Sequence, residues 1–266
     1  MTDRARLAAF DVLAAVREQD AFANLALAAL LRERGLTGRD AGFVTELASG
    51  TLRRRGSYDA VLTPLVARSL GRLQPAVLDV LRLGCHQLLG MRVPAHAAVA
   101  TSVDLVRARV GRSPAGLVNA VLRKVATHDL DAWMRRVAPD PAADPVGYAA
   151  VVHSHPRWVV EALGEALGPA GEELEALLAA DNEPPSVTLA ALPGLAEPAE
   201  LPGTPTGRSP YAVVLVGGDP AAVPAVAQGR ARVQDEGSQL VAILAAAASV
   251  AGPDRRWLDM CAGPGG

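Results

Sequence analysis

Prolines are spread unevenly along this 266-residue chain, since four of the 20 lie in residues 1–136 and the other 16 follow. Proline lacks a backbone N–H and interrupts the interior of helices and strands. Residues 1–136 can therefore form long uninterrupted helices, whereas the remainder must be rich in turns and loops. The chain is predicted to contain two regions of different architecture.

Apolar spacing in the first region predicts about seven helices with short connections, a pattern typical of an antiparallel bundle. We expect the third helix to end in Arg53, Arg54 and Arg55, before Gly56. The later helices are expected over residues 58–69, 76–91 and 96–110, and a last one, GLVNAVLRKV, is opened by Pro114. The helix over 76–91 is the most apolar and should be central, and Leu117 in the last helix should point inward.

The composition indicates which residues fill the core and argues against a disulfide-rich, metal-binding or membrane protein. Half of the residues are hydrophobic but only 3% are aromatic, so Ala, Leu and Val must fill the core. Segments rich in Ala and Leu with few β-branched runs favour helix. Cys85 and Cys261 are too few for a disulfide framework and lack metal-ligand spacing. The N-terminus has no signal-peptide core, and the longest apolar stretch, 240–252, is shorter than the about 20 residues of a membrane helix. We expect a soluble cytoplasmic protein with no membrane or metal partner.

The net charge of −2 conceals a division between the two regions. Counting Lys and Arg against Asp and Glu, residues 1–136 carry +8 and residues 137–266 carry −10. Such asymmetry suggests that the first region meets a polyanion. Ordinary surface variation on a helical domain is the alternative.

The second region begins with a predicted linker, residues 131–150, whose APDPAADPVG segment disfavours regular structure. A small α+β unit is expected over 151–232, with a helix in HPRWVVEALGEAL and strands in SVTLAAL and YAVVLVG. Residues 233–266 then supply a helix in LVAILAAAA and a short strand in RWLDM, which runs into CAGPGG.

A strand that ends in an acidic residue and enters a glycine-rich turn is how an open α/β sheet presents a nucleotide-like ligand. Glycine lets the backbone approach the ligand closely, and the N–H groups of a following helix would face an anionic group. Asp259, at the strand end, could hold the loop or an ammonium group of the ligand. A flexible GPGG tail is the alternative.

The segment LDMCAGPGG resembles the first S-adenosylmethionine (SAM)-binding motif of the RNA cytosine-C5 methyltransferases, and VQDEGSQLVA resembles the segment that precedes that motif. SPAGLVNAVLRKV, DAGFVTELASGTLR and VPAHAAVATSVDLV are similar to a NusB-like RNA-binding domain over residues 1–130. This combination is that of the RsmB (Sun) family, which methylates 16S ribosomal RNA. SVTLAAL departs from the family, because the usual Arg-Val-Asn is missing.

The resemblance implies a mainly α chain: a NusB-like bundle, a small α+β unit, and the first helix and strand of a Rossmann-like SAM methyltransferase domain. It implies a cofactor loop made of Asp259, Cys261, Ala262, Gly263, Pro264, Gly265 and Gly266. The family's two catalytic cysteines are expected beyond Gly266, so no catalytic residue is assigned. We expect these 266 residues to be inactive and to show no SAM binding. The helix over 240–248 and the strand over 257–260 should be poorly packed.

Phosphate contacts give affinity for RNA without reading its sequence. The candidates are nine arginines, Arg4, Arg6, Arg53, Arg54, Arg55, Arg107, Arg109, Arg112 and Arg123. The alternative for the 53–55 run is a solvated helix end, where cations favour the helix dipole.

Several other residues invite a functional interpretation, but a structural one is preferred. Cys85, among apolar neighbours, is expected to be a buried thiol, and Asn119 a buried hydrogen-bonding residue. His153 and His155 are expected at turn or cap positions, and Trp158 and Trp257 in packing.

The favoured function is SAM-dependent methylation of a cytosine in small-subunit ribosomal RNA by the full-length protein. The alternative is a non-enzymatic NusB-like RNA-binding or antitermination module with a degenerate tail. A SAM enzyme acting on protein or a small molecule is a weaker third possibility, which the basic helical region opposes.

Overall fold

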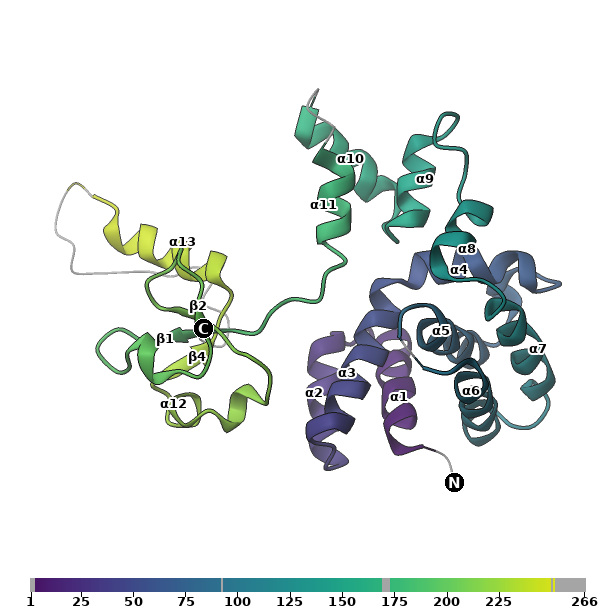
Figure 1. Cartoon of the computed structure of the whole chain (residues 1–266), viewed down its shortest axis with the longest axis horizontal. Helices are drawn as coiled ribbons and strands as arrows, with labels where there is room; N and C mark the ends of the chain where they lie inside the picture. Colours follow the sequence, from purple (N-terminus) through teal and green to yellow (C-terminus); the bar gives the residue numbers. More distant parts are fainter. Residues whose placement is uncertain (1–2, 92, 169–172, 250, 252–266) are drawn as a thin grey trace. The chain divides into compact units, whose positions relative to one another are not determined.

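The computed structural model describes residues 3–91, 93–168, 173–249 and 251 (Figure 1). The chain divides into two compact units, Met1–Pro184 and Pro185–Gly266, and each has apolar core residues of its own. The mainly α composition expected from the sequence is confirmed.

The first unit contains the seven helices predicted for its N-terminal part. They are α1 (Arg4–Gln19), α2 (Ala23–Glu33), α3 (Gly38–Arg53), α4 (Arg55–Leu62), α5 (Pro75–Leu89), α6 (Ala95–Arg109) and α7 (Ala115–Val125). Short 3-10 turns follow α4 at η1 (Thr63–Leu65) and η2 (Leu70–Arg72).

Helix α5 occupies the centre of this bundle (Figure 1). It packs against α1, α3, α4, α6 and α7, and its buried residues lie on several faces of the helix. Pro75 occupies its first turn, where the missing N–H leaves no helical hydrogen bond unmade. The prediction of a central fifth helix is confirmed.

Three details of the predicted bundle are wrong. Gly56 lies inside α4 instead of separating two helices, because the junction between α3 and α4 falls two residues earlier, at Arg54. Helix α4 ends at Leu62 and not near residue 69, because Pro64 enters a 3-10 turn and cannot supply the N–H that a longer α-helix needs. Leu117 is 38% exposed, so it does not point into the core.

The segment expected to be a linker contains two helices, α8 (Leu130–Val137) and α9 (Pro145–Val152). Asp129 caps α8 by accepting a hydrogen bond from the Ala132 N–H, and Trp133 is buried in the bundle core. Asp144 caps α9 through the Gly147 N–H. The prolines of APDPAADPVG therefore interrupt helix only over the short stretch between α8 and α9.

Helices α10 (Arg157–Leu167) and α11 (Leu174–Ala180) complete the first unit. They pack with α9 around a small separate core of Ala149, Val160 and Leu178. The structure thus groups residues up to Pro184 with the bundle, whereas the sequence suggested a separate α+β unit starting at residue 151.

The second unit is built on a four-stranded antiparallel sheet in the order β2-β3-β1-β4. Its strands are β1 (Thr188–Ala191), β2 (Thr204–Pro205), β3 (Ala212–Val214) and β4 (Ala231–Val233). Strands β1 and β3, predicted from the sequence, pair with Leu189 opposite Val213. Gly203 precedes β2 with a φ of +148°, and a Cβ there would overlap the Val214 carbonyl oxygen.

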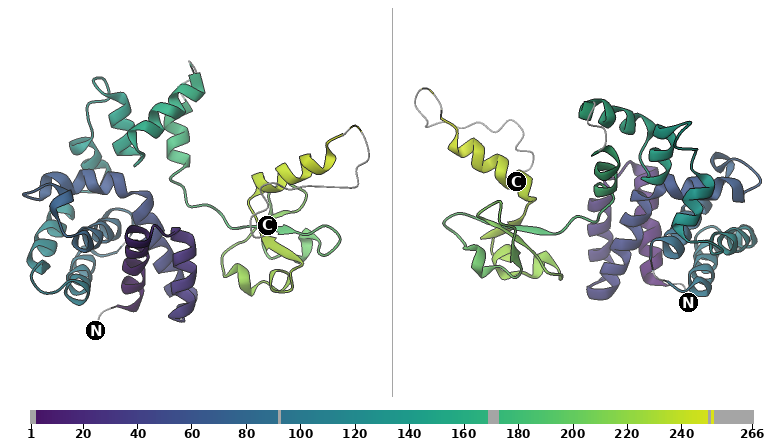
Figure 2. Two further views of the ribbon diagram at one scale, coloured as in Figure 1. Left: turned by 180° about the vertical axis from the view of Figure 1, so that it is seen from behind. Right: turned by 45° about the horizontal axis from the view of Figure 1, so that its top comes forward.

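Helices α12 (Pro224–Ala227) and α13 (Glu236–Ala247) accompany this sheet, with short 3-10 turns η4 (Pro198–Glu200) and η5 (Pro220–Ala222) in its loops (Figure 2). Val241 and Leu244 of α13 are 66% and 70% exposed. The prediction that this helix is poorly packed is confirmed. The predicted strand over 257–260 lies outside the described residues.

Candidate functional site

The seven residues predicted to bind SAM, Asp259 and 261–266, lie outside the described part of the chain. Their roles remain predictions. The described residues include the VQDEGSQ segment, which the sequence linked to the same motif.

This segment fastens the start of α13 to the loop between β2 and β3. Asp235 caps the helix by accepting from the Gly237 N–H. Glu236 Oε1 accepts from the Thr206 hydroxyl and, at 2.9 Å, from the Ser209 N–H. The Ser209 hydroxyl in turn lies 2.8 Å from the amide oxygen of buried Gln239. The hydrogen bond from Thr206 and that from the Ser209 backbone hold the pKa of Glu236 below its usual value.

Four of the nine predicted RNA-binding arginines already have partners inside the protein. Arg6 donates from Nε to Gln87 Oε1 at 2.7 Å, pairs with Asp3, and lies 4.8 Å from the Phe43 ring centroid. Arg109 lies 2.5 Å from Asp11 Oδ2. Such arginines are held by the fold and are less able to turn toward a ligand.

The other two arginines of this group are bound more loosely. Arg4 donates to the Arg34 carbonyl oxygen at 2.6 Å, and Arg107 lies 3.5 Å from Asp104 with both side chains exposed. Exposed pairs of this kind contribute little to stability and exchange easily with a phosphate.

The remaining five, Arg53, Arg54, Arg55, Arg112 and Arg123, form no side-chain hydrogen bond or ion pair with any residue that the structure describes. Arg55, Arg112 and Arg123 are exposed, while Arg53 and Arg54 are half-buried. The run 53–55 spans the junction of α3 and α4, and Arg112 and Arg123 lie before and within α7. These five are free to meet the phosphates of a polyanion.

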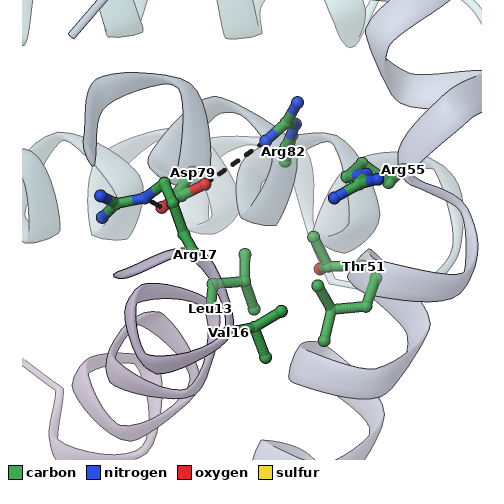
Figure 3. A pocket seen from close by; sticks show the side chains of 8 residues that line it. Leu13, Val16, Arg17, Thr51, Arg55, Asp79 and Arg82 are labelled. Carbon is green, nitrogen blue, oxygen red and sulfur yellow. Dashed lines mark hydrogen bonds and ion pairs between the residues drawn. The ribbon is translucent and has the colours of Figure 1, made fainter. Parts of the chain in front are cut away.

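Sequence reasoning missed a cluster of buried charge beside Arg55. Asp79 of α5 has a side chain only 4% exposed, yet it accepts from Arg17 Nε of α1 at 2.8 Å. Arg82 donates to both carboxylate oxygens of Asp59, at 2.8 and 2.7 Å, and its Nη1 lies 3.5 Å from Asp79 (Figure 3). A carboxylate in the apolar stretch PAVLDVLRLG was the available signal, because an unpaired buried charge is very costly.

Burial lowers the pKa of Arg82, but its hydrogen bonds and charge attraction to Asp59 and Asp79 outweigh that effect and raise it overall. Arg82 therefore keeps its positive charge in the physiological range. The cluster joins α1, α4 and α5, and the residues around it line a pocket.

A second buried polar pair, also missed, links α4 and α5. The Tyr58 hydroxyl lies 2.8 Å from His86 Nδ1, and both side chains are buried. Burial lowers the pKa of His86, although Glu46, whose Oε1 lies 3.3 Å from Nε2, acts in the opposite direction. The neutral imidazole that results suits a structural role in the core.

The structural interpretations of the remaining candidates are only partly right. Cys85 is fully buried, and burial raises its pKa, so the prediction of an inert thiol is confirmed. His153 caps the end of α9 and its carbonyl oxygen accepts from His155 Nδ1 at 2.7 Å, as expected for a turn. Trp158 is 70% exposed, so its prediction as a packing residue is wrong, because its position on α10 faces away from the small core.

Asn119 is half-buried instead of buried, because it lies at the edge of the apolar face of α7. Trp257 lies outside the described residues. Among the described residues, no group of three His, Cys, Asp or Glu side chains is placed to hold a metal ion. No helix in the same part of the chain is long and apolar enough to cross a membrane.

Residues 3–127 match the NusB family. The chain is 52% identical over 268 residues to "Putative methyltransferase MT1451" of Mycobacterium tuberculosis, covering 99% of this chain and 59% of that protein. It is 35% identical over 274 residues to ribosomal RNA small subunit methyltransferase B of Pseudomonas putida, covering 98% of this chain and 58% of that protein. The chain therefore spans a little under 60% of the length of these relatives.

The crystal structure of the protein PH0851 superposes with a TM-score of 0.66, covering 91% of this chain and 54% of that chain at 16% sequence identity. At this identity the likeness concerns the fold alone. Residues 3–127 thus match the NusB family, and nearly the whole chain is similar to ribosomal RNA small subunit methyltransferases B.

Proposed function

We propose that the whole protein transfers a methyl group from SAM to C5 of a cytosine in small-subunit ribosomal RNA. In this proposal the NusB-family part docks the RNA, and residues 233–266 begin the methyltransferase domain. The observation that carries the proposal is the match to ribosomal RNA small subunit methyltransferase B over 98% of this chain. The cytoplasm, where ribosomal RNA is modified, is the proposed location.

The SAM site is proposed from the sequence LDMCAGPGG. Gly263, Gly265 and Gly266 would let the backbone approach the ligand, and the loop N–H groups would face its methionine carboxylate. Bound SAM would supply the methyl group. The attachment of α13 through Glu236 and Gln239 would fix the helix that precedes this loop. No residue of this chain is assigned to the methyl transfer itself.

The RNA contacts are proposed for the arginines that have no side-chain partner among the described residues, Arg53, Arg54, Arg55, Arg112 and Arg123, with Arg4 and Arg107 in support. Arg6 and Arg109 contribute less, because Gln87, Asp3 and Asp11 hold them. The domain division proposed with this function is 1–130 for RNA binding, 131–150 and 151–232 as connecting parts, and 233–266 for SAM binding.

A non-enzymatic NusB-type module explains the basic helical region equally well. The methyltransferase names of relatives matched along nearly all of the chain favour the enzyme.

The reaction is tested with the protein expressed from its gene, including any codons that follow Gly266. We expect SAM-dependent incorporation of labelled methyl into small-subunit ribosomal RNA, with the product read as a cytosine that resists bisulfite conversion. Methylation at another atom or on protein would contradict the cytosine-C5 assignment.

The 266-residue chain itself is expected to show no heat of SAM binding by titration calorimetry, because the helix before the loop is poorly packed. Micromolar affinity would overturn this expectation and place a competent cofactor site within these residues.

A further inference from the structure

The buried charge cluster forms one side of a pocket of about 320 Å³ inside the NusB-family part (Figure 3). Four helices, α1, α3, α4 and α5, contribute to it. The lining residues are Leu13, Val16, Arg17, Thr51, Leu52, Arg55, Asp79 and Arg82.

One side of the pocket is polar and held in place. Asp79 is fixed by Arg17 at 2.8 Å, and Arg82 is fixed by its two hydrogen bonds to Asp59. Among the described residues, the carboxylate oxygens of Asp79 keep free lone pairs. Arg17 Nη2 likewise has no partner there, because Nε and Nη1 donate to Asp79 and Glu18. This side therefore offers both acceptors and donors in a preformed arrangement.

The opposite side of the pocket is apolar, and Leu13 and Val16 of α1 lie there (Figure 3). Leu52 of α3 also lines the pocket, and Thr51 turns its hydroxyl to the Leu47 carbonyl oxygen at 2.5 Å. Pockets of about 300 Å³ and above accept small ligands. An apolar floor facing a donor and acceptor wall fits a flat heteroaromatic group better than a fully hydrated ion.

Arg55 lies at one end of the polar side, beyond Arg82 (Figure 3). Within the described residues it forms no hydrogen bond or ion pair through its side chain, and it is exposed. The charges of Arg17 and Arg82 are balanced by Asp79, Asp59 and Glu18. As far as the described residues show, Arg55 is the cation of the pocket that no carboxylate balances, which suits one phosphodiester and not a doubly charged free phosphate.

We infer that this pocket receives one unstacked base of single-stranded RNA, with the adjoining phosphate at Arg55. This inference rests on the proposed RNA-docking function. Proteins recognise single-stranded RNA by taking splayed-out bases onto flat or apolar surfaces and bonding their edges. Every base edge carries both donors and acceptors, so Asp79 and Arg17 favour no single base strongly. The site adds a base contact to a surface otherwise composed of phosphate contacts.

The test compares binding of a fluorescein-labelled single-stranded dodecamer of cytidine with binding of a duplex RNA of equal length, by fluorescence anisotropy of the 266-residue chain. Val16→Trp fills the pocket from α1 without changing charge, and Leu52→Phe fills it from α3. Both side chains are half-buried, and circular dichroism melting checks that each variant folds. We expect each to weaken single-strand binding about tenfold, the effect of losing one stacked base, and to leave duplex binding unchanged.

Arg55→Gln should weaken single-strand binding and lower its salt dependence by about one phosphate contact. The matched control, Arg112→Gln, removes an equal charge outside the pocket and should weaken single-strand and duplex binding alike. If both pocket-filling variants fold and bind the single strand as the native chain does, the pocket inference is wrong although RNA docking stands. If the native chain binds neither RNA, the docking function itself fails and the inference with it.

Discussion

The two units of this chain differ in how far they bury their apolar side chains. In the first, α5 is surrounded by five other helices and most of its residues are buried. In the second, Gln239 is the one buried residue of α13, and Val241 and Leu244 are more than 60% exposed. Helices owe most of their stability to packing of an apolar face. The bundle therefore holds its helices through its own contacts, whereas α13 depends on hydrogen bonds at its first turn.

The largest difference in stability between the two units is expected from two matched leucine-to-alanine substitutions. Leu81→Ala removes a fully buried side chain of α5 and should lower the free energy of unfolding by about 2–5 kcal/mol. Leu244→Ala, at a position 70% exposed, should change it by less than about 0.5 kcal/mol. Urea denaturation followed by circular dichroism measures both. A comparable loss for the two variants would show that α13 is packed in solution and remove the contrast.

The next largest difference in stability is expected between substitutions at two glycines of α3. One glycine is in contact with the core, and the other faces open space. A Cβ at Gly50 would overlap the buried His86 ring, so Gly50→Ala should cost about 1–3 kcal/mol. A Cβ at Gly42 meets nothing within 4 Å, so Gly42→Ala should stabilise the helix by about 0.5–1 kcal/mol. Thermal unfolding of the two variants should move in opposite directions. If Gly50→Ala leaves the free energy of unfolding unchanged, the His86 ring can move aside.

A smaller effect should be a pH dependence of the free energy of unfolding. It should be confined to the first unit, since the described residues after Pro184 include no histidine. Burial lowers the pKa of His86 below its ordinary value of about 6.5. The unfolded chain then binds more protons than the folded one as the pH falls through 6.5. Stability should decrease toward acid pH by at most about 1.4 kcal/mol per pH unit, until the lowered pKa is passed.

His86→Gln should flatten most of this slope between pH 7 and 5, leaving a smaller part to His153, whose pKa burial also lowers. Denaturation midpoints measured across this range provide the test. An unchanged slope in the variant would assign the pH dependence to other groups.

The same comparison explains which features could be predicted from the sequence. Helices α1 to α7 follow from apolar spacing, because their buried faces meet one another within the same segment. Helix α8 escaped prediction, because the prolines that follow it obscured the Asp129 cap and the burial of Trp133. Strand β2 has only two residues, and β4 (ARV) lacks the run of apolar residues that marked YAVVLVG.

The site was less predictable than the fold, because tertiary contacts decide which arginine forms an ion pair with which carboxylate. Arg109 and Arg112 are nearly adjacent in sequence, yet only Arg109 meets Asp11, which lies 98 positions away. The pocket draws Arg17, Arg55 and Asp79 from three different helices. The sequence around each of these residues does not indicate that it lies near the other two.

We propose that residues 3–127, which match the NusB family, dock RNA through arginines that form no side-chain hydrogen bond or ion pair with any described residue. The most direct measurement is the salt dependence of single-stranded RNA binding by the native chain, by the double variant Arg112→Gln/Arg123→Gln, and by the control Arg208→Gln/Arg232→Gln in the second unit. The first double variant should bind more weakly, with a log–log salt slope reduced by about 1.4 for two lost phosphate contacts, while the control behaves as the native chain does. Equal loss in both double variants, or loss in the control alone, would contradict the claim.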